Sequence, residues 1–235
     1  MKIHETVGKL KELYPRFKEE ATEYLNKARK IETVLGPGTA ICYCWFYSVP
    51  QRWTALEPRI MKLAEETEYF NLERILKLGY SELKCLFNGI VFHNIISLQF
   101  RRFCSAIAKI YGSWEKFGKI LKEKDIVALF RELRNESNIR LTFKNLSAMK
   151  IIVGQDDNLL IPDTHVGNFL GLTFKEITMC RQDPKAFLAL VDQCHLITRE
   201  LKILGLKDIS TAKWSLAIWF SKAKTSASQL LPCIQ

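Results

Sequence analysis

Apolar residues recur at helical spacing along almost the entire chain, and this periodicity restricts the fold more than any other feature of the sequence. Residues 3–31 alternate charged and apolar positions in this way and stop before Gly36-Pro37-Gly38, a strong helix break. The β-branched residues do not form alternating runs bounded by hairpin turns, which is the pattern typical of strands. The sequence therefore predicts an all-α fold.

Further helices are expected wherever the helical spacing resumes after a polar or glycine-containing break. Helix starts capped by a polar side chain are expected at Asn71 and at Ser81. The other helices are predicted at residues 39–47, 59–64, 95–111, 114–121, 125–134, 143–153, 165–170, 174–179, 183–204 and 210–222. After Lys224 the chain is expected to fray, unless Leu230-Leu231-Pro232 docks back onto the body.

The charge balance of the chain indicates the kind of partner that it binds. It carries 35 lysine and arginine residues against 25 aspartate and glutamate residues, a formal net charge of +10. This excess favours a phosphate-bearing partner over an acidic small molecule. With 235 residues and 48% hydrophobic content, the chain can bury a sizeable core. That core would belong either to one large domain or to two closely packed lobes that share a crevice.

The cysteines indicate whether the chain binds a metal, and the first residues bear on the cellular compartment in which it works. Seven cysteines are scattered along the chain, mostly among apolar residues, where a reduced thiol packs as a small hydrophobe: Cys42, Cys44, Cys85, Cys104, Cys180, Cys194 and Cys233. The close pair Cys42 and Cys44 lacks metal-ligand spacing, so no metal is expected. The chain opens on the charged segment Met1-Lys2-Ile3-His4-Glu5, and no run reaches the ~18 apolar residues of a membrane span. We expect an intracellular protein, in the cytoplasm or nucleoid of a prokaryotic source, without a membrane partner.

Lys144 lies 19 residues before Asp163, which belongs to the turn Ile161-Pro162-Asp163-Thr164-His165-Val166. The residues between them are typical of a helix followed by a short return loop, so the amine and the carboxylate can reach the same crevice. A polar turn at residues 135–138 and a short hairpin at residues 139–142 precede this helix. The first amides of the helix are expected to lack partners, which would make the hairpin a seat for a phosphate. An amine that faces a carboxylate in a basic protein indicates covalent chemistry on a polyanion.

The segment from the hairpin to the second turn resembles the helix-hairpin-helix DNA glycosylases. Pro162-Asp163-Thr164-His165-Val166, followed by Phe169-Leu170-Gly171-Leu172, is similar to the family's catalytic turn and the helix that it opens. The hairpin departs from the family pattern, because Arg140-Leu141-Thr142-Phe143-Lys144 lacks the two usual glycines. The archaeal 8-oxoguanine DNA glycosylases are also glycine-poor there, and Lys144-Asn145-Leu146 with Lys150-Ile151 is similar to that branch. The resemblance covers residues 39–222, and its specific part is residues 139–172.

The resemblance implies a single unit over residues 1–235. Two closely packed helical lobes, with their main portions at residues 39–134 and 143–222, would enclose an active-site crevice, and residues 135–172 would supply the hairpin and the catalytic loop. The implied activity is removal of 8-oxoguanine from damaged double-stranded DNA by a monomer that needs no cofactor. Lys144 would attack the sugar C1′, form a Schiff base and cut the strand by elimination. Asp163 would stabilise the developing positive charge and assist proton transfer.

Further residues are expected to contact the DNA or the extruded base. Candidates for contacts with the DNA backbone are Arg140, Leu141, Thr142, Phe143, Lys150 and His165. Gln51 would fill the gap in the base stack or contact the lesion, and Trp219 would line the base pocket. A plainer interpretation makes Gln51 part of a polar loop and Trp219 a core residue.

Other functions also agree with the sequence. A monofunctional glycosylase for alkylated or mismatched bases would use Asp163 to activate water and leave Lys144 incidental. A helical DNA- or RNA-binding module without activity would leave both side chains without a shared crevice. In isolation, Lys144 would be an ordinary surface lysine and Asp163 a helix cap. A scaffold for protein partners would leave the Pro-Asp-Thr-His turn unexplained.

Overall fold

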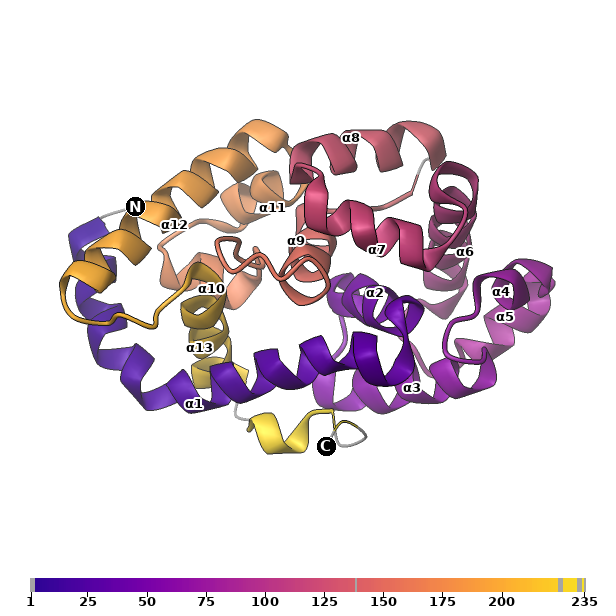
Figure 1. The fold of residues 1–235 in the computed structure, drawn as a ribbon, viewed down its shortest axis with the longest axis horizontal. Coiled ribbons are helices and arrows are strands. Elements are labelled where there is room, and N and C mark those ends of the chain that lie inside the picture. Colours follow the sequence, from indigo (N-terminus) through magenta and orange to yellow (C-terminus); the bar gives the residue numbers. More distant parts are fainter. Residues whose placement is uncertain (1–2, 138, 224–225, 232–233, 235) are drawn as a thin grey trace.

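The computed structural model describes residues 3–137, 139–223, 226–231 and 234, and every regular element among these residues is a helix (Figure 1). The prediction of an all-α fold is therefore confirmed. Within the same residues, no helix is long and apolar enough to cross a membrane. The six described cysteines are free thiols, and all except Cys85 are buried. The seventh, Cys233, and the predicted tail residues Lys224 and Pro232 lie outside the described residues.

The helices follow one another with short connections. Their bounds are α1 (Ile3–Leu35), α2 (Pro37–Trp45), the 3-10 turn η1 (Phe46–Ser48), α3 (Trp53–Glu66), α4 (Leu72–Lys77), α5 (Tyr80–Leu86), α6 (His93–Tyr111), α7 (Trp114–Glu123), α8 (Ile126–Ser137), α9 (Phe143–Ile152), α10 (Thr164–Phe169), α11 (Phe174–Gln182), α12 (Pro184–Ile203), α13 (Thr211–Ala223) and the 3-10 turn η2 (Ala227–Gln229).

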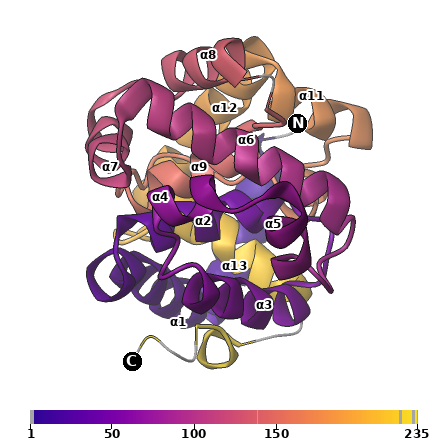
Figure 2. The same cartoon turned by 90° about the vertical axis from the view of Figure 1, so that its right-hand side faces the viewer.

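The first helix runs along one side of the molecule and packs against α2, α12 and α13 (Figures 1 and 2). It ends at Leu35, where Gly36 takes a φ of 87° that favours glycine. Pro37 then occupies the first turn of α2, where a missing amide hydrogen costs nothing. The predicted break is thus found where it was expected, and the helix before it is four residues longer than predicted.

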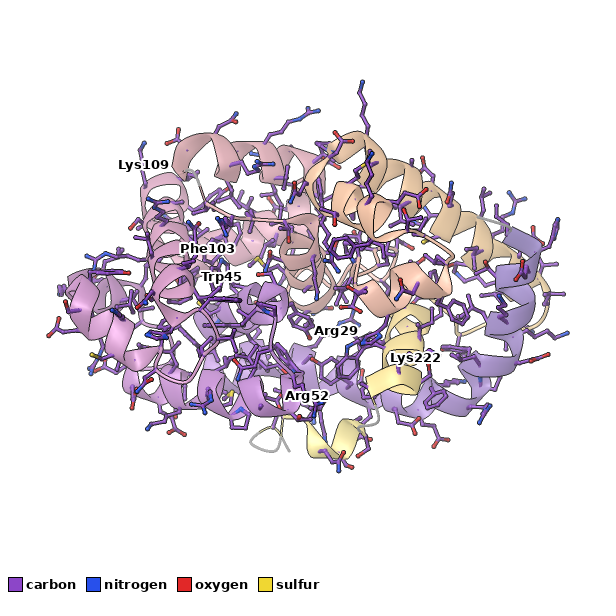
Figure 3. The ribbon with its side chains drawn as sticks, turned by 180° about the vertical axis from the view of Figure 1, so that it is seen from behind. Arg29, Trp45, Arg52, Phe103, Lys109 and Lys222 are labelled. Carbon is purple, nitrogen blue, oxygen red and sulfur yellow. The ribbon has the colours of Figure 1, made fainter. Side chains whose placement is uncertain are left out.

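Helix α9 lies inside the molecule, in contact with α2, α7, α8 and α11 (Figure 1). Nine of its ten residues are buried, and Lys144 is the exception. Trp45 closes the core next to it, with its ring 6.2 Å from that of Phe103 (Figure 3). Burial on all sides holds α9 rigidly, so the position of Lys144 is fixed by the core.

Several predicted helix boundaries differ from the structure, among them those of α8 and α5. Helix α8 continues through Ser137 into the segment predicted as a polar turn, and Asn138 lies outside the described residues. Helix α5 begins at Tyr80, because the Glu82 carboxylate accepts the amide hydrogen of Gly79 at 2.6 Å and caps the helix earlier than Ser81 would. The start predicted at Asn71 is confirmed, since its side chain accepts the amide hydrogen of Arg74 at 3.0 Å.

Of the two alternatives for the chain after Lys224, the structure shows the docking of Leu230 and Leu231 onto the body, and the fraying that was expected first is not found in residues 226–231. Both residues are buried, and η2 packs against α1. The amide of Leu231 donates a hydrogen bond of 3.0 Å to Oε2 of Glu57, a buried residue of α3. This bond ties the last described segment to the third helix.

Candidate active site

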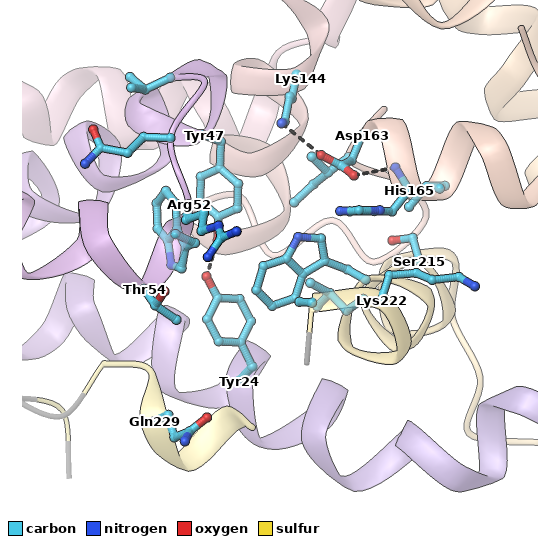
Figure 4. A pocket seen from close by; sticks show the side chains of 18 residues that line it. Tyr24, Tyr47, Arg52, Thr54, Lys144, Asp163, His165, Ser215, Lys222 and Gln229 are labelled. Atoms are coloured by element: carbon cyan, nitrogen blue, oxygen red, sulfur yellow. Dashed lines mark hydrogen bonds and ion pairs between the residues drawn. The ribbon is translucent and has the colours of Figure 1, made fainter. Parts of the chain in front are cut away.

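A pocket of about 900 Å³ opens between α1, α3, α9, α10 and α13 (Figure 4). Its aromatic lining consists of Tyr24, Tyr47, Trp53 and Trp219, and its ionisable lining includes Arg52, Lys144, Asp163, His165 and Lys222. A pocket of this size and mixed lining is typical of small-ligand sites. The residues come from distant parts of the sequence, so the complete fold is needed to assemble the site.

Lys144 and Asp163 meet in this pocket, as predicted. Nζ of Lys144 donates to Oδ2 of Asp163 at 2.9 Å, and the two side chains are only 18% and 14% exposed (Figure 4). Lys144 stands in the first turn of α9, and Asp163 precedes the first residue of α10. The return loop between the two helices brings the groups together.

Asp163 has two structural partners at once. Its Oδ1 accepts the amide hydrogen of His165 at 2.7 Å, which caps α10, while Oδ2 accepts from Lys144. The expectation that one carboxylate both caps a helix and faces the crevice is confirmed. Burial acts to raise the pKa of the Asp163 carboxyl, but the Lys144 ammonium and the His165 amide outweigh it and hold this pKa below its usual value. Asp163 is therefore ionised at neutral pH.

Arg181 of α11 forms hydrogen bonds with the residues on both sides of Asp163. Its Nε donates to the carbonyl oxygen of Pro162 at 2.8 Å, and its Nη2 donates to Oγ1 of Thr164 at 3.0 Å. Burial lowers the pKa of the Arg181 guanidinium, and the charge of Asp163 acts in the opposite direction. Arg181 was missed in the sequence, because nothing in its local pattern distinguishes it from an arginine near a helix C-terminus.

The hairpin differs from the predicted phosphate seat. The side chains of Leu141 and Phe143 are buried, and Phe143 stacks between the rings of Phe130 and Phe187 at 4.1 and 4.2 Å. Because these two side chains form part of the core, only the backbone of Leu141 and Phe143 could make the predicted contact with DNA. Arg140 keeps an exposed side chain and remains a candidate.

Two amides of the hairpin already have partners. The amide of Arg140 donates to Oε1 of Gln99 at 2.8 Å, and that of Thr142 donates to Oδ1 of Asn145 at 3.3 Å. The hydroxyl of Thr142 also donates to Oδ1 of Asn145, at 2.7 Å. These groups are engaged within the protein in this structure, so a phosphate contact through them would require these hydrogen bonds to break.

Lys150 also departs from its predicted role as a phosphate contact. Its side chain turns inward, and Nζ donates to the carbonyl oxygens of Leu121 at 2.8 Å and Lys124 at 2.9 Å. Only 7% of the residue is exposed. The ammonium caps the C-terminal end of α7, where the orphan carbonyls favour a positive charge. A DNA contact by Lys150 is therefore excluded in this structure.

The remaining predicted residues line the pocket. Trp219 and His165 are both among its walls, and Gln51 lines it while its Oε1 accepts the amide hydrogen of Val91 at 3.0 Å. Gln51 is thus held in place by the segment before α6. The lining residues that sequence reasoning missed include Tyr24, Tyr47, Arg52, Trp53 and Lys222, which come from segments without a recognisable motif.

No protein-family model, curated protein or solved structure gives a significant match to this chain. Among the described residues, no group of three or more histidine, cysteine, aspartate or glutamate side chains is arranged to hold a metal ion. The site is therefore interpreted from its own geometry.

Proposed function

We propose that the protein is a DNA glycosylase that also cleaves the strand at the resulting abasic site. The observation that carries this proposal is the Lys144–Asp163 pair, held at 2.9 Å in a pocket of about 900 Å³ in a protein with a net charge of +10. A nucleotide must leave the base stack for its C1′ to be attacked, and a pocket of this volume accommodates an extruded nucleoside.

The proposed DNA-binding element is the helix-hairpin-helix formed by α8, residues 139–142 and α9. In this arrangement, Arg140 contributes an exposed side chain, and Arg52 and Lys222 place positive charge at the pocket (Figures 3 and 4). Such charges attract phosphates without reading the base sequence. The helices on either side of the pocket would act as the two lobes of the enzyme.

In the proposed reaction, the Lys144 ammonium first gives a proton to Asp163, the nearest acceptor. The Nζ lone pair then attacks C1′, the bond from C1′ to the base nitrogen breaks, and the base leaves with the electron pair and is protonated. Ring opening gives a Schiff base between Nζ and C1′. Loss of a proton from C2′ then expels the 3′ phosphate and cuts the strand. Asp163 passes the proton that it took from Lys144 to the departing base, and its regenerated carboxylate then stabilises positive charge at the sugar.

The proposed substrate is an oxidised purine, with 8-oxoguanine as the narrower assignment. Trp219 and Trp53 offer aromatic surfaces to a planar base, and Gln51 offers a polar group at the same pocket. The narrower assignment derives from the sequence resemblance around Lys144, and the pocket lining supports a planar ligand.

Borohydride trapping tests the proposal. With 8-oxoguanine duplex and borohydride, the wild-type protein should become covalently linked to DNA, because the reductant fixes the Schiff base. Lys144→Arg is the matched control, since it keeps a positive charge beside Asp163 but cannot form the Schiff base. Trapping of Lys144→Arg at the wild-type level would overturn the assignment of Lys144 as the nucleophile.

A monofunctional glycosylase is the second candidate, favoured by one observation. Nζ of Lys144 is paired with the Asp163 carboxylate at 2.9 Å, and a lysine held in an ion pair does not offer a free lone pair to C1′. In that case Asp163 would activate water, and the base would be released without strand scission. Gel analysis of the product, with and without added alkali, separates the two candidates.

A further inference from the structure

Three tyrosines and one glutamate form a continuous line of hydrogen bonds from the pocket into the core. The hydroxyl of Tyr47 contacts that of Tyr24, which contacts that of Tyr43 at 3.3 Å. Tyr43 in turn donates to Oε1 of Glu57 at 2.5 Å. Tyr24 and Tyr47 line the pocket, whereas Tyr43 and Glu57 are buried (Figure 4). The mechanism proposed above does not use this line.

The carboxylate at the inner end fixes the direction of these bonds. Both oxygens of Glu57 accept, one from Tyr43 and the other from the amide of Leu231. Burial raises the pKa of all three phenols above the usual value, so each keeps its single proton. Because Tyr43 donates its proton to Glu57, its oxygen can only accept from Tyr24. Tyr24 has then used its proton, so its oxygen can only accept from Tyr47.

The Tyr47 hydroxyl, at the outer end of the line, consequently has no hydrogen left to donate to a ligand in the pocket. Tyr47 has given its proton to Tyr24, and its oxygen offers lone pairs only. Tyr24, which also lines the pocket, has one further lone pair. A phenol in water presents either a donor or an acceptor, but this line makes the pocket wall a fixed hydrogen-bond acceptor.

We propose that Tyr47 and Tyr24 bind the extruded base by accepting a hydrogen bond from one of its N–H or NH₂ groups. Tyr43 and Glu57 are positioning residues that act through Tyr24 and Tyr47. They keep the hydroxyl hydrogens of these two tyrosines directed away from the ligand. A base that presents an acceptor lone pair to these hydroxyl oxygens would place two acceptors opposite each other with no hydrogen between them. Such a base is rejected. This inference rests on the proposed glycosylase function and names the chemical group of the base that the pocket recognises.

Tyr43→Phe tests the inference without changing an atom that lines the pocket. The variant cuts the line between Tyr24 and Glu57, so the outer hydroxyls are no longer held in one orientation. Two single-turnover rates are measured: release of 8-oxoguanine from duplex DNA, by chromatography of the free base, and strand cleavage at a preformed abasic site, on a gel. The second substrate has no base and serves as the measure of an intact fold.

We expect base release to slow by about 10-fold or more in Tyr43→Phe, with cleavage at the abasic site unchanged. Tyr47→Phe removes the outer acceptor itself and should show the same split, which keeps the test decisive if Tyr43→Phe folds poorly. The matched control is Tyr14→Phe in α1, because the buried Tyr14 hydroxyl has no hydrogen-bond partner among the described residues. This control should leave both rates at the wild-type level.

The outcomes distinguish the inference from the function on which it rests. If the wild type performs both reactions and the two variants slow neither, or slow both equally, the acceptor line is wrong and the glycosylase function stands. If the wild type performs neither reaction, both are overturned. A selective loss of base release in both variants supports the inference.

Discussion

Arg181 donates its Nε hydrogen to the carbonyl oxygen of Pro162, 2.8 Å away, and thereby fixes the residue that precedes Asp163. The same guanidinium holds Thr164, the residue that follows it. One side chain of α11 therefore sets the position of the carboxylate in the pocket, although it does not line the pocket itself.

Replacing Arg181 by methionine should lower the rate of base release by about 10- to 100-fold, because a displaced carboxylate stabilises the transition state less well. Arg181→Lys keeps one donor and should recover part of the rate. The pH dependence of the rate gives a second readout, since a merely destabilised fold would leave its midpoints in place. Arg16→Met, at an exposed position of α1, is the control and should behave as the wild type. Wild-type kinetics in Arg181→Met would show that the hydrogen bonds from Arg181 to Pro162 and Thr164 have no role in base release.

Asp163→Asn should reveal a stabilising contribution that depends on pH. The pKa of the Asp163 carboxyl is lowered in the folded protein, relative to about 3.9 in an unfolded chain. The ionised group therefore stabilises the fold fully above about pH 4, and this stability is lost as the pH falls through the lower folded pKa. Asparagine still accepts from the His165 amide, so the variant removes the charge and keeps the helix cap.

Urea unfolding of Asp163→Asn and the wild type across the acidic range measures this effect. The advantage of the wild type should be constant from about pH 5 to about pH 8 and shrink below about pH 4. An advantage that persists unchanged under strongly acidic conditions would show that the carboxylate charge is not its source.

Lys150→Met should destabilise the fold by about 1.5–3 kcal/mol, because a buried charged donor is lost and two carbonyls of the α7 end are left without it. The slope of the logarithm of the DNA-binding constant against the logarithm of the salt concentration should equal that of the wild type. Arg140→Met is the paired variant, with an exposed side chain, and should reduce the salt slope by about one unit with little change in stability. A reduced slope in Lys150→Met would contradict the buried position of its ammonium.

Phe143→Ala should cost about 3–5 kcal/mol of unfolding free energy, since its ring is fully buried between Phe130 and Phe187. Phe174→Ala provides the comparison, because Phe174 is 72% exposed and its loss should change stability by less than about 0.5 kcal/mol. Chemical denaturation measures both. Equal effects in the two variants would be incompatible with the stacked position of Phe143.

The parts of the structure that depend on local sequence could be predicted. Helix α1 ends at the Gly36-Pro37 break, and α4 starts at the Asn71 cap, because backbone conformation and capping act over a few residues. The meeting of Lys144 and Asp163 was also predictable, since one helix and one return loop connect them. Errors of a few residues arose where a competing local cap was overlooked, as Glu82 was at the start of α5.

The parts that depend on tertiary packing could not be predicted. The inward direction of Lys150 follows from the position of the α7 end, which no local pattern encodes. Tyr24 and Trp53 come from helices that carry no motif, and they reach the pocket only because α1 and α3 pack there. The partner of the Arg140 amide could not be predicted either, because its acceptor, Gln99, lies on another element.

The hydrogen bond between Glu57 and Leu231 joins positions 174 residues apart, so one of the earliest helices and one of the last segments share a single carboxylate. During synthesis the chain emerges from its N-terminal end, and Glu57 has no amide partner until the residues near position 231 have been made. A nascent polypeptide consequently lacks the interaction that completes the inner end of the tyrosine line. Completion of the pocket wall therefore has to wait for the residues near position 231.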